Sequence, residues 1–516
     1  MQIKENKNME KLVIGWSEQN ITPDRPVSLC GQFAERISVG VEKPITVTAL
    51  ALSAGNEQMV LVSADLAGIG YPLRDAVREK VRTVPGLDPE KIMISAIHTH
   101  TSMEYAKDWA YPDRFQEYHM IPYEDLGLRA EDHPYLEAAD VKDPELFAGM
   151  EAFDWLTEKI ALAVKTAWEA REPGSFVHAF GRAAVGMCRR TQYNDRTAAM
   201  WGDTNTARFE SLEGGNDSGI ELIYTFGRDG KLTGIIPNIA CPAQCVQHRM
   251  FISPDFWGES KQLLRRRFGK DLFMLPLCSA AGDQCPVDLV RWVEPESDVH
   301  DPNIKRNDPP ARKADPSMFD LSGMRVTGRR IAEEIIHVYE DGLSDKISEA
   351  AFRHEWFELN LPLRRVSSGE YQDAVRSYRD AILRKSEKKL DFNDVADHLI
   401  DAGIIDRYHL QELTEFDRVE IHIIRLGSIA FATNPFELFL DYGNQIRARS
   451  KAEQTFLIQL CNGDEGYLPT KKAEKHGHYS AIVGSGYVGH EGGDLLVRAT
   501  LDKINELFTE QTDPKL

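Results

Sequence analysis

The alternation of hydrophobic and polar positions predicts β-hairpins at several places along the chain. In each, two apolar or β-branched runs flank a short turn that contains Gly, Asn or Asp, a composition typical of hairpins. The predicted pairs are Leu50–Ala54 with Met59–Asp65, Ile220–Phe226 with Thr233–Ala240, and Val419–Leu426 with Ser428–Thr433. Further single strands are predicted at Lys91–Ile97, Leu272–Leu277 and Thr455–Leu460.

Helices are predicted where apolar residues recur about every 3.6 positions between turn residues. These segments are Pro72–Thr83, Pro144–Glu172, Pro254–Phe268, Gly323–Tyr339, Gly369–Lys389 and Leu495–Leu507. Because strands and helices alternate along the whole length, the sequence predicts a mixed α/β (α+β) fold with mixed sheets and flanking helices. We expect one large domain over residues 10–510, with surface insertions at 103–141 and 295–316.

Several predicted strands end in the same way, with an apolar run followed at once by side chains capable of chemistry. The strand Lys91–Ile97 runs directly into two histidines one residue apart, which suit a metal site and ordinary strand ends equally well. A sheet holds its strand ends rigidly while the following loops converge, so these segments together predict one site. The side chains concerned are His98, His100, Cys241, Gln244, His248, Asp283, Cys285, Glu437 and Tyr467.

Composition narrows the class of protein. The chain has 516 residues, of which 42% are hydrophobic and 9% aromatic, enough to bury a core. Its net charge of -20 argues against nucleic acid and anionic membrane surfaces as partners. Neither a transmembrane stretch nor the apolar region of a signal peptide is recognisable. The 7 cysteines lack the spacing of a disulfide scaffold. We therefore expect a cytoplasmic protein without stable membrane insertion.

A series of short motifs resembles the neutral/alkaline (non-lysosomal) ceramidases, in their N-terminal catalytic domain. In chain order these are ITPDRPVSLCGQ, LVSADLAGI, ISAIHTHTS, CRRTQYND, PNIACPAQ with ISPDF, SAAGDQCP, ATNPFE and GYLPT. ISAIHTHTS is the most specific of them, and the resemblance extends from about Ile21 to Leu507. The chain is thereby identified as a divergent member, in which we expect the family's C-terminal immunoglobulin-like domain to be absent.

The resemblance implies a zinc-dependent amidase. Zinc lowers the pKa of bound water to about 7, a neighbouring imidazole moves the proton, and Arg and Tyr donate to the oxygen where negative charge develops. By motif match, the implied Zn²⁺ ligands are His98, Glu437 and Tyr467, the acid/base residue is His100, the substrate-polarising arginine is Arg189 or Arg190, and the oxyanion tyrosine is Tyr479.

Two motifs depart from the family pattern. The second histidine ligand would fall near Pro242, which cannot bind a metal, so His248 is predicted in its place, with Cys241 and Gln244 as rivals. The family's serine in a GDxSP-like motif is here Cys285, which would be a nucleophile if a base lowered its pKa, and otherwise a buried spectator. Two aspartates at strand ends, Asp65 and Asp283, are candidates for orienting the histidines.

Three functions follow from this interpretation. The first is a zinc-dependent hydrolase that cleaves an amide (N-acyl) or related bond in an N-acyl lipid or a polar, sugar-like amide. The second is a carbohydrate-active lyase or hydrolase on the same scaffold, which would use His100, Tyr479 and Arg189 for acid–base chemistry. The third is a metal-free binding protein, for which Pro242 is the main argument. The aromatic and acidic residues of 103–141 suit a polar ligand as well as a lipid.

Overall fold

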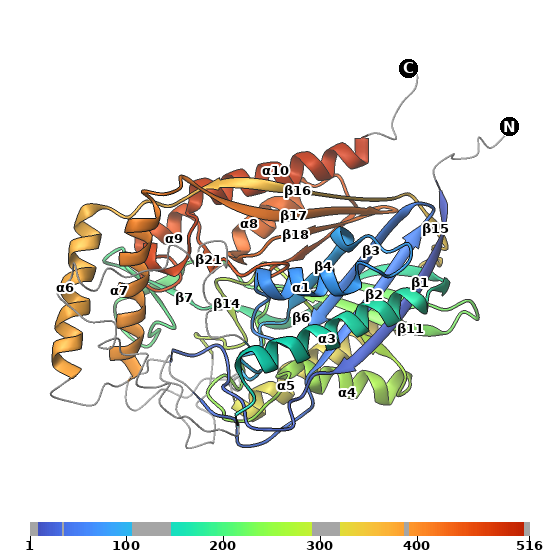
Figure 1. Ribbon diagram of the computed structural model, residues 1–516, viewed down its shortest axis with the longest axis horizontal. Helices are drawn as coiled ribbons and strands as arrows, with labels where there is room; N and C mark the ends of the chain where they lie inside the picture. Colours follow the sequence, from blue (N-terminus) through green and yellow to red (C-terminus); the bar gives the residue numbers. More distant parts are fainter. Residues whose placement is uncertain (1–8, 34–35, 106–145, 292–319, 386–391, 510–516) are drawn as a thin grey trace.

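The computed structural model describes residues 9–33, 36–105, 146–291, 320–385 and 392–509. The predicted insertion at 295–316 lies outside these residues, as does the insertion at 103–141 from residue 106 onward. The described elements form the mixed α/β arrangement that the sequence predicts, with helices packed around several sheets (Figure 1).

The first sheet carries the strand that leads into the two histidines. Its strands are β15 (Glu349–Ala350), β1 (Glu10–Asn20), β2 (Thr46–Ala54), β3 (Glu57–Ala64) and β4 (Ile92–Ala96), with β5 (Glu172–Pro173) beside β1. Strand β4 is buried along its whole length and pairs in parallel with β3, which explains its unbroken apolar sequence. Helices α1 (Tyr71–Val81) and α3 (Gly149–Glu169) pack beside this sheet (Figure 1).

The second sheet is built around the hairpin β10–β11. Its strands are β12 (Phe273–Met274), β11 (Leu232–Ile239), β10 (Asp217–Phe226), β6 (Ser175–Cys188) and β14 (Gln284–Cys285), with β13 (Leu277–Cys278) beside β11. Helices α4 (Phe256–Phe268) and α5 (Asp320–Glu340) pack against each other, and α5 packs on β6. The Asp255 side chain caps α4 by accepting from the Phe256 amide at 2.6 Å.

The third sheet and its helices complete the core. This sheet has the order β16 (Phe352–Pro362), β17 (Phe416–Leu426), β18 (Ile429–Thr433) and β20 (Gln454–Ile458), with α8 (Leu440–Arg449) and α10 (His490–Thr509) beside it. Smaller sheets are formed by β19 (Glu437–Leu438) with β21 (Tyr467–Leu468) and by β8 (Ala198–Met200), β7 (Arg190–Tyr193) and β9 (Phe209–Leu212). The hairpin of α6 (Ser368–Lys385) and α7 (Phe392–Leu410) lies at one end of the molecule, with α9 (Lys471–His476) nearby (Figure 1).

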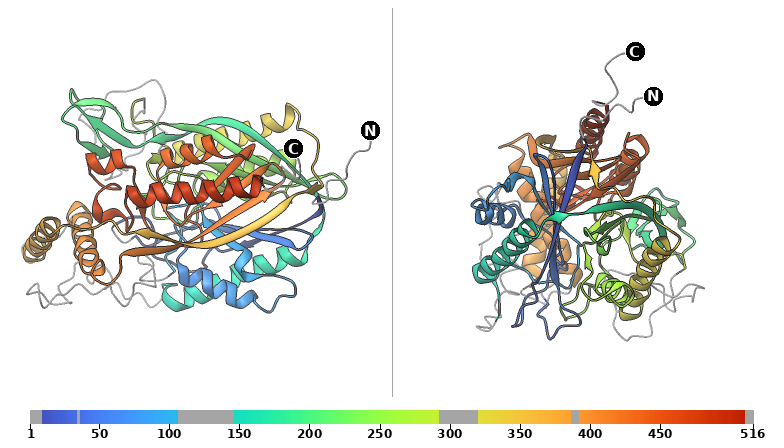
Figure 2. Two further views of the ribbon diagram at one scale, coloured as in Figure 1. Left: turned by 90° about the horizontal axis from the view of Figure 1, so that it is seen from above. Right: turned by 90° about the vertical axis from the view of Figure 1, so that its right-hand side faces the viewer.

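Backbone hydrogen bonds join the strand ends of all three large sheets, which pack together along the molecule (Figure 2). The end of β4 is bonded to the segment after β20 (Ala96 N to Leu460 O, 3.2 Å), and that segment is bonded to the end of β13 (Gln459 N to Cys278 O, 3.1 Å). Ser279 N then donates to Ile239 O at the end of β11, at 2.7 Å. The loops that follow these strands therefore begin close together, as the sequence predicts.

The predicted hairpins and most helices are confirmed, with shifts of a few residues at their ends. The predicted strand Leu272–Leu277 is split into β12 and β13 around Pro276, because proline has no N–H to donate to a ladder. The last predicted helix starts earlier, at His490. Strands β1, β6 and β16 and helix α7 were not predicted. In β1 and β6 the buried positions do not alternate cleanly with exposed ones, so the sequence carries no regular period of two.

Asn462 ties the histidine strand to the loop that leads into Tyr467. Its Oδ1 accepts from Ile94 N at 2.7 Å, and its Nδ2 donates to Ile92 O at 3.1 Å and to Glu420 Oε1 at 2.8 Å. We expect Asn462→Ala to lower the free energy of unfolding by about 2–3 kcal/mol, because the buried backbone N–H of Ile94 loses its acceptor. Asn56→Ala, at an exposed turn, is the matched control and should cost less than about 0.5 kcal/mol. Urea denaturation checks both, and equal stabilities would contradict this role.

Candidate active site

His98 follows β4 in a left-handed backbone conformation, with φ of +60°, which is unusual for a residue with a side chain. Its Nδ1 donates to Ala67 O at 2.6 Å, and this bond fixes the ring so that Nε2 points into the site. There Nε2 lies 3.3 Å from Glu437 Oε2. Burial disfavours the charged ring, but the Glu437 carboxylate outweighs it and raises the pKa of His98 above its ordinary value.

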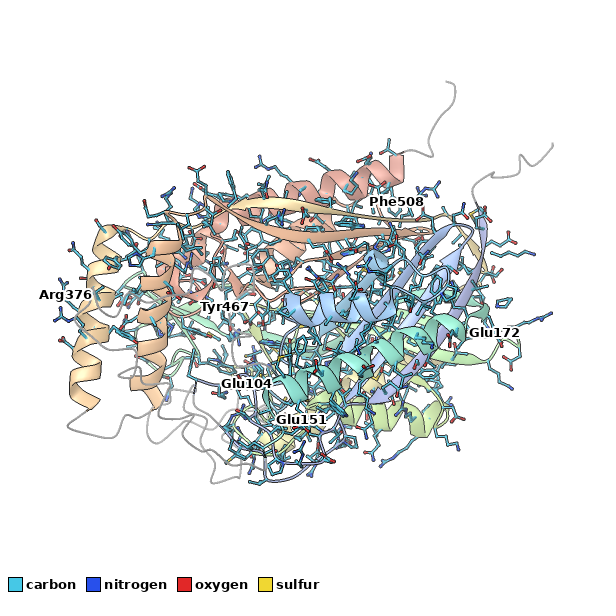
Figure 3. All side chains as sticks on the ribbon, viewed as in Figure 1. Glu104, Glu151, Glu172, Arg376, Tyr467 and Phe508 are labelled. Atoms are coloured by element: carbon cyan, nitrogen blue, oxygen red, sulfur yellow. The ribbon has the colours of Figure 1, made fainter. Side chains whose placement is uncertain are left out.

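Glu437 and Tyr467 lie directly opposite each other because β19 and β21 pair in parallel with these residues in register. They lie on separate segments of the sequence, after β18 and after β20, and both side chains are buried. Figure 3 labels Tyr467 on the ribbon. Burial, and then the charge of Glu437, raises the pKa of the Tyr467 phenol well above its ordinary value. The hydroxyl is therefore protonated in this arrangement.

Arg189 is buried at the centre of the site, where its guanidinium connects these groups. Its Nη2 donates to Tyr467 Oη at 3.1 Å and to Gly282 O at 2.9 Å, and lies 3.7 Å from Glu437 Oε2. Burial opposes its charge, but the interactions with Tyr467 and Glu437 outweigh it and raise the pKa of Arg189. The site therefore contains a fixed cation beside a carboxylate.

Gln244 links Arg189 to His100, and this link defines the protonation of His100. Arginine can only donate, so the bond from Arg189 Nη1 to Gln244 Oε1 (2.9 Å) places the amide NH₂ at the other end. That NH₂ lies 2.8 Å from His100 Nε2, which must accept. A neutral His100 then has its proton on Nδ1, a buried atom without a hydrogen-bond partner among the described residues. Burial, and then the neighbouring His98, lowers the pKa of His100 well below its ordinary value.

Gly31 allows His100 to occupy this position. A Cβ at Gly31 would lie 2.4 Å from His100 Cγ, closer than any real contact, and its φ of +93° favours glycine as well. Gly31 belongs to the N-terminal motif SLCGQ, which the sequence reading matched to the family without assigning it a role. Its role is to leave room for the imidazole.

Tyr479 completes a relay of hydroxyl groups that begins at Arg189. Its ring packs edge-on against Tyr467 and against Phe33, with a centroid distance of 5.4 Å in each case. The Tyr467 hydroxyl donates to Tyr479, which raises the pKa of Tyr467 and opposes the effect of burial on Tyr479. Burial raises the pKa of Tyr479 to about 12, so its hydroxyl is protonated near neutral pH.

Asp464 is a carboxyl group of the site that the sequence reading did not identify. Burial, and then the charge of Glu437, raises its pKa to about 7, while the positive charge of His98 opposes this. The only sequence signal is its position in CNGDEGY, three residues before Tyr467. The site thus combines two carboxyl groups with His98 and Arg189.

The donors His98 and Glu437 fit a metal ion. Two ligands of a tetrahedral zinc with bonds of about 2.0–2.1 Å lie roughly 3.3 Å apart. That is the separation of His98 Nε2 and Glu437 Oε2, at 3.3 Å. The bond of His98 to Ala67 O also leaves Nε2 as its ligand atom. Among the described residues, no group of three or more His, Cys, Asp or Glu side chains could hold a metal. A further donor would be Tyr467, which lies opposite Glu437, and zinc binding stays a prediction.

The other predicted residues are placed as follows. His248 lies beside α5, with Nε2 3.6 Å from Asp320 Oδ1, whereas its rival Gln244 contacts His100. Burial raises the pKa of the Cys285 thiol to about 12, which favours a spectator thiol over a nucleophile. Asp65 accepts from Thr46 and Asp283 from the Leu440 amide, so both hold backbone near the site. The roles of His248 and Cys285 stay predictions.

Metal content and turnover separate the His248 and Gln244 assignments. We expect His248→Ala to retain its metal and its activity, because His248 lies with Asp320. We expect Gln244→Ala to retain the metal but to lose about 10- to 100-fold in turnover, since Arg189 and His100 would each lose a buried hydrogen-bond partner worth about 1–3 kcal/mol. Elemental analysis and initial rates are the measurements. Metal lost only from His248→Ala would instead identify His248 as the missing ligand.

Comparison with known proteins identifies the fold. No protein-family model matches the sequence, and no curated protein matches it. Among solved structures, the neutral ceramidase from Pseudomonas aeruginosa is similar, with a TM-score of 0.62 and 15% identity over 98% of this chain and 76% of that chain. A ceramidase complexed with C2 gives a TM-score of 0.61 and 14% identity over the same shares. The expected resemblance to neutral ceramidases is confirmed for the fold.

Proposed function

We propose that this chain is a metal-dependent hydrolase that cleaves an amide (N-acyl) or related bond. The observation that carries the proposal is the meeting of His98, Glu437, Arg189 and Tyr467 at one buried point, with an imidazole that is neutral beside them. These groups supply a cation, a carboxylate, hydroxyl donors and a base, which is the set that acyl transfer to water requires.

The proposed cofactor is Zn²⁺, held by His98 and Glu437 with Tyr467 as the third ligand. When bound, zinc would lower the pKa of a bound water to about 7 and polarise the substrate oxygen. The bond from His98 Nδ1 to Ala67 O orients the ring for this role and raises its basicity as a ligand.

Arg189 and Tyr479 would stabilise the oxygen that gains negative charge in the transition state. Arg189 stays charged because Tyr467 and Glu437 outweigh its burial, and Tyr479 keeps its proton because its pKa is about 12. Arg189 is held before substrate arrives by Gly282, Gln244 and Tyr467, and the Tyr479 ring packs on Tyr467 and Phe33. Donors fixed in this way need no reorganisation during the reaction.

His100 would move the proton. Its neutral ring would give up the hydrogen bond that Nε2 accepts from Gln244, take a proton from the attacking water at that nitrogen, and pass this proton to the leaving nitrogen. His98 lies next to it, with 3.3 Å between the two Nε2 atoms. The base therefore adjoins the proposed metal ligand.

The substrate class that we propose is an N-acyl compound, either an N-acyl lipid or a polar, sugar-like amide. The fold of neutral ceramidases supports the acyl amide, while the carboxyl groups of Glu437 and Asp464 beside the aromatic rings of Tyr467 and Tyr479 suit a polar head group. None of the helices in the described ranges has the length and apolar character needed to cross a membrane.

Product analysis tests this function. The purified protein, supplied with zinc, is incubated with a short-chain ceramide, an N-acylated aminocoumarin and an N-acetylated amino sugar. We expect release of a free amine and a carboxylic acid from at least one of them, and loss of that release in Tyr479→Phe. No amine from any probe would contradict the proposal.

The second candidate is a carbohydrate-active lyase or hydrolase on the same scaffold. The observation that favours it is the neutral His100 beside Arg189 and Tyr479, since a base and two donors can also abstract a proton and stabilise an enolate. A lyase would leave an unsaturated product that absorbs in the ultraviolet, which the same product analysis detects on uronic-acid oligosaccharides.

A further inference from the structure

The neighbouring arginines Arg189 and Arg190 have side chains on opposite sides of the chain. Successive side chains of an extended segment alternate in direction, and Arg190 is the first residue of β7. Arg189 enters the site, whereas Arg190 faces the loop that carries Tyr479. Both are almost completely buried, at 1% and 0% exposure, so Arg190 is also part of the interior.

The Arg190 guanidinium binds the Tyr479 loop through its backbone. Nη1 donates to Tyr479 O at 2.9 Å and to Ser480 Oγ at 3.2 Å, and Nη2 donates to Gly477 O at 2.8 Å. A planar fork with several donors is required for this pattern, and lysine has no such fork. Arg190 thus holds the backbone on both sides of His478.

A buried carboxylate anchors Arg190 in turn. Glu213 accepts from Arg190 Nε, and its Oε1 accepts from His476 Nδ1 at 2.8 Å. Lys472 Nζ donates to the Glu213 carbonyl oxygen. Glu213 is therefore tied to both ends of α9, the helix that leads into the Tyr479 loop, through its carboxylate at His476 and through its backbone carbonyl at Lys472.

The loop needs such an anchor because its backbone is strained. Gly477, His478 and Ser480 have φ values of +71°, +69° and +71°. For residues with side chains, a left-handed backbone is costly and persists only where the surroundings impose it. The bonds from Arg190 act on this strained backbone at the position where the Tyr479 ring packs on Tyr467.

We propose that Arg190 is a positioning residue, which holds the loop 476–480 so that the Tyr479 hydroxyl faces the substrate oxygen. This rests on the proposed function for its catalytic consequence, but the loop-holding role is independent of any activity. The sequence left Arg189 and Arg190 as alternatives for one role, and the structure assigns them two.

Limited trypsin digestion of Arg190→Lys tests the loop-holding role directly. We expect cleavage after Lys475, mapped by mass spectrometry, to be at least about ten-fold faster than in the wild type, because local opening exposes the segment. Arg208→Lys, at an exposed ion pair with Asp195, is the matched control and should be cut at the wild-type rate. An unchanged rate in a folded Arg190→Lys would overturn the proposal.

Kinetics on the probe that the wild type hydrolyses test the catalytic consequence. We expect kcat of Arg190→Lys to fall about 10- to 100-fold with KM nearly unchanged, and Tyr479→Phe to cost far less in that background than in the wild type. If the two substitutions lower kcat independently, so that their effects add in free energy in the double variant, the positioning role is overturned.

If the wild type hydrolyses no probe, the proposed function fails, and the digestion alone decides the role of Arg190. If Arg190→Lys does not fold, Arg190→Met with Glu213→Gln, which leaves no buried charge unpaired, takes its place in both experiments.

Discussion

His98→Ala is expected to lose the bound metal and to lower kcat/KM by roughly 10³-fold or more, since a catalytic metal contributes several kcal/mol to the transition state. His98 Nε2 is the nitrogen donor of the proposed pair, and the Glu437 oxygen 3.3 Å away cannot hold zinc without it. Elemental analysis of protein purified from zinc-supplemented medium gives the metal content, and initial rates give kcat/KM.

His337→Ala is the control for this experiment, because its ring is largely exposed on α5 and pairs with Glu334 and Asp341. It should keep both metal and activity. A His98→Ala protein that retains about one zinc per chain would place the metal elsewhere. One that retains full activity without the metal would contradict the proposed mechanism.

Arg189→Met is expected to lower kcat by about 10²- to 10³-fold, the usual cost of removing one donor to a developing oxyanion. The guanidinium is charged, buried and held by Gly282 O, Gln244 and Tyr467, so no nearby group can replace it. The kcat of Arg189→Lys should be little better than that of Arg189→Met, because an ammonium group lacks the planar set of donors that binds these three partners at once.

Steady-state kinetics, with metal content measured alongside, check the result for Arg189. If Arg189→Met binds as much zinc as the wild type, the fall in kcat is due to the missing guanidinium donor and not to loss of the metal. Arg208→Met, on the surface, should leave kcat unchanged. A kcat near the wild-type value in Arg189→Met would remove Arg189 from the reaction.

The sequence predicts that the site residues converge, because the pattern that indicates it is contained in short, continuous segments. Each contributing strand is a short apolar run, as in β4, and the polar residues come directly after it. The backbone bonds from Ala96 through Leu460, Gln459 and Cys278 to Ile239 realise that prediction. The pairing of Glu437 with Tyr467 depends on the register of β19 and β21, which no local pattern specifies.

The details that the sequence leaves open depend on which way a side chain points. After β11 the chain turns sharply, with Gln244 N bonded to Pro242 O at 2.9 Å, and this turn directs Gln244 rather than His248 toward His100. The choice between Arg189 and Arg190 likewise depends on which side of the segment entering β7 lies toward the site. Such directions follow from packing between distant segments, and a single sequence does not contain them.

The measurement that tests the proposed hydrolysis most directly is product labelling in H₂¹⁸O. The zinc-supplied protein is incubated with the N-acyl probe that it turns over, and the released acid is analysed by mass spectrometry. Hydrolysis at this site predicts one ¹⁸O atom in the carboxylic acid and an equal amount of free amine, both lost in His98→Ala and Arg189→Met. An unsaturated product without label, or a labelled acid that both variants still release at the wild-type rate, would contradict it.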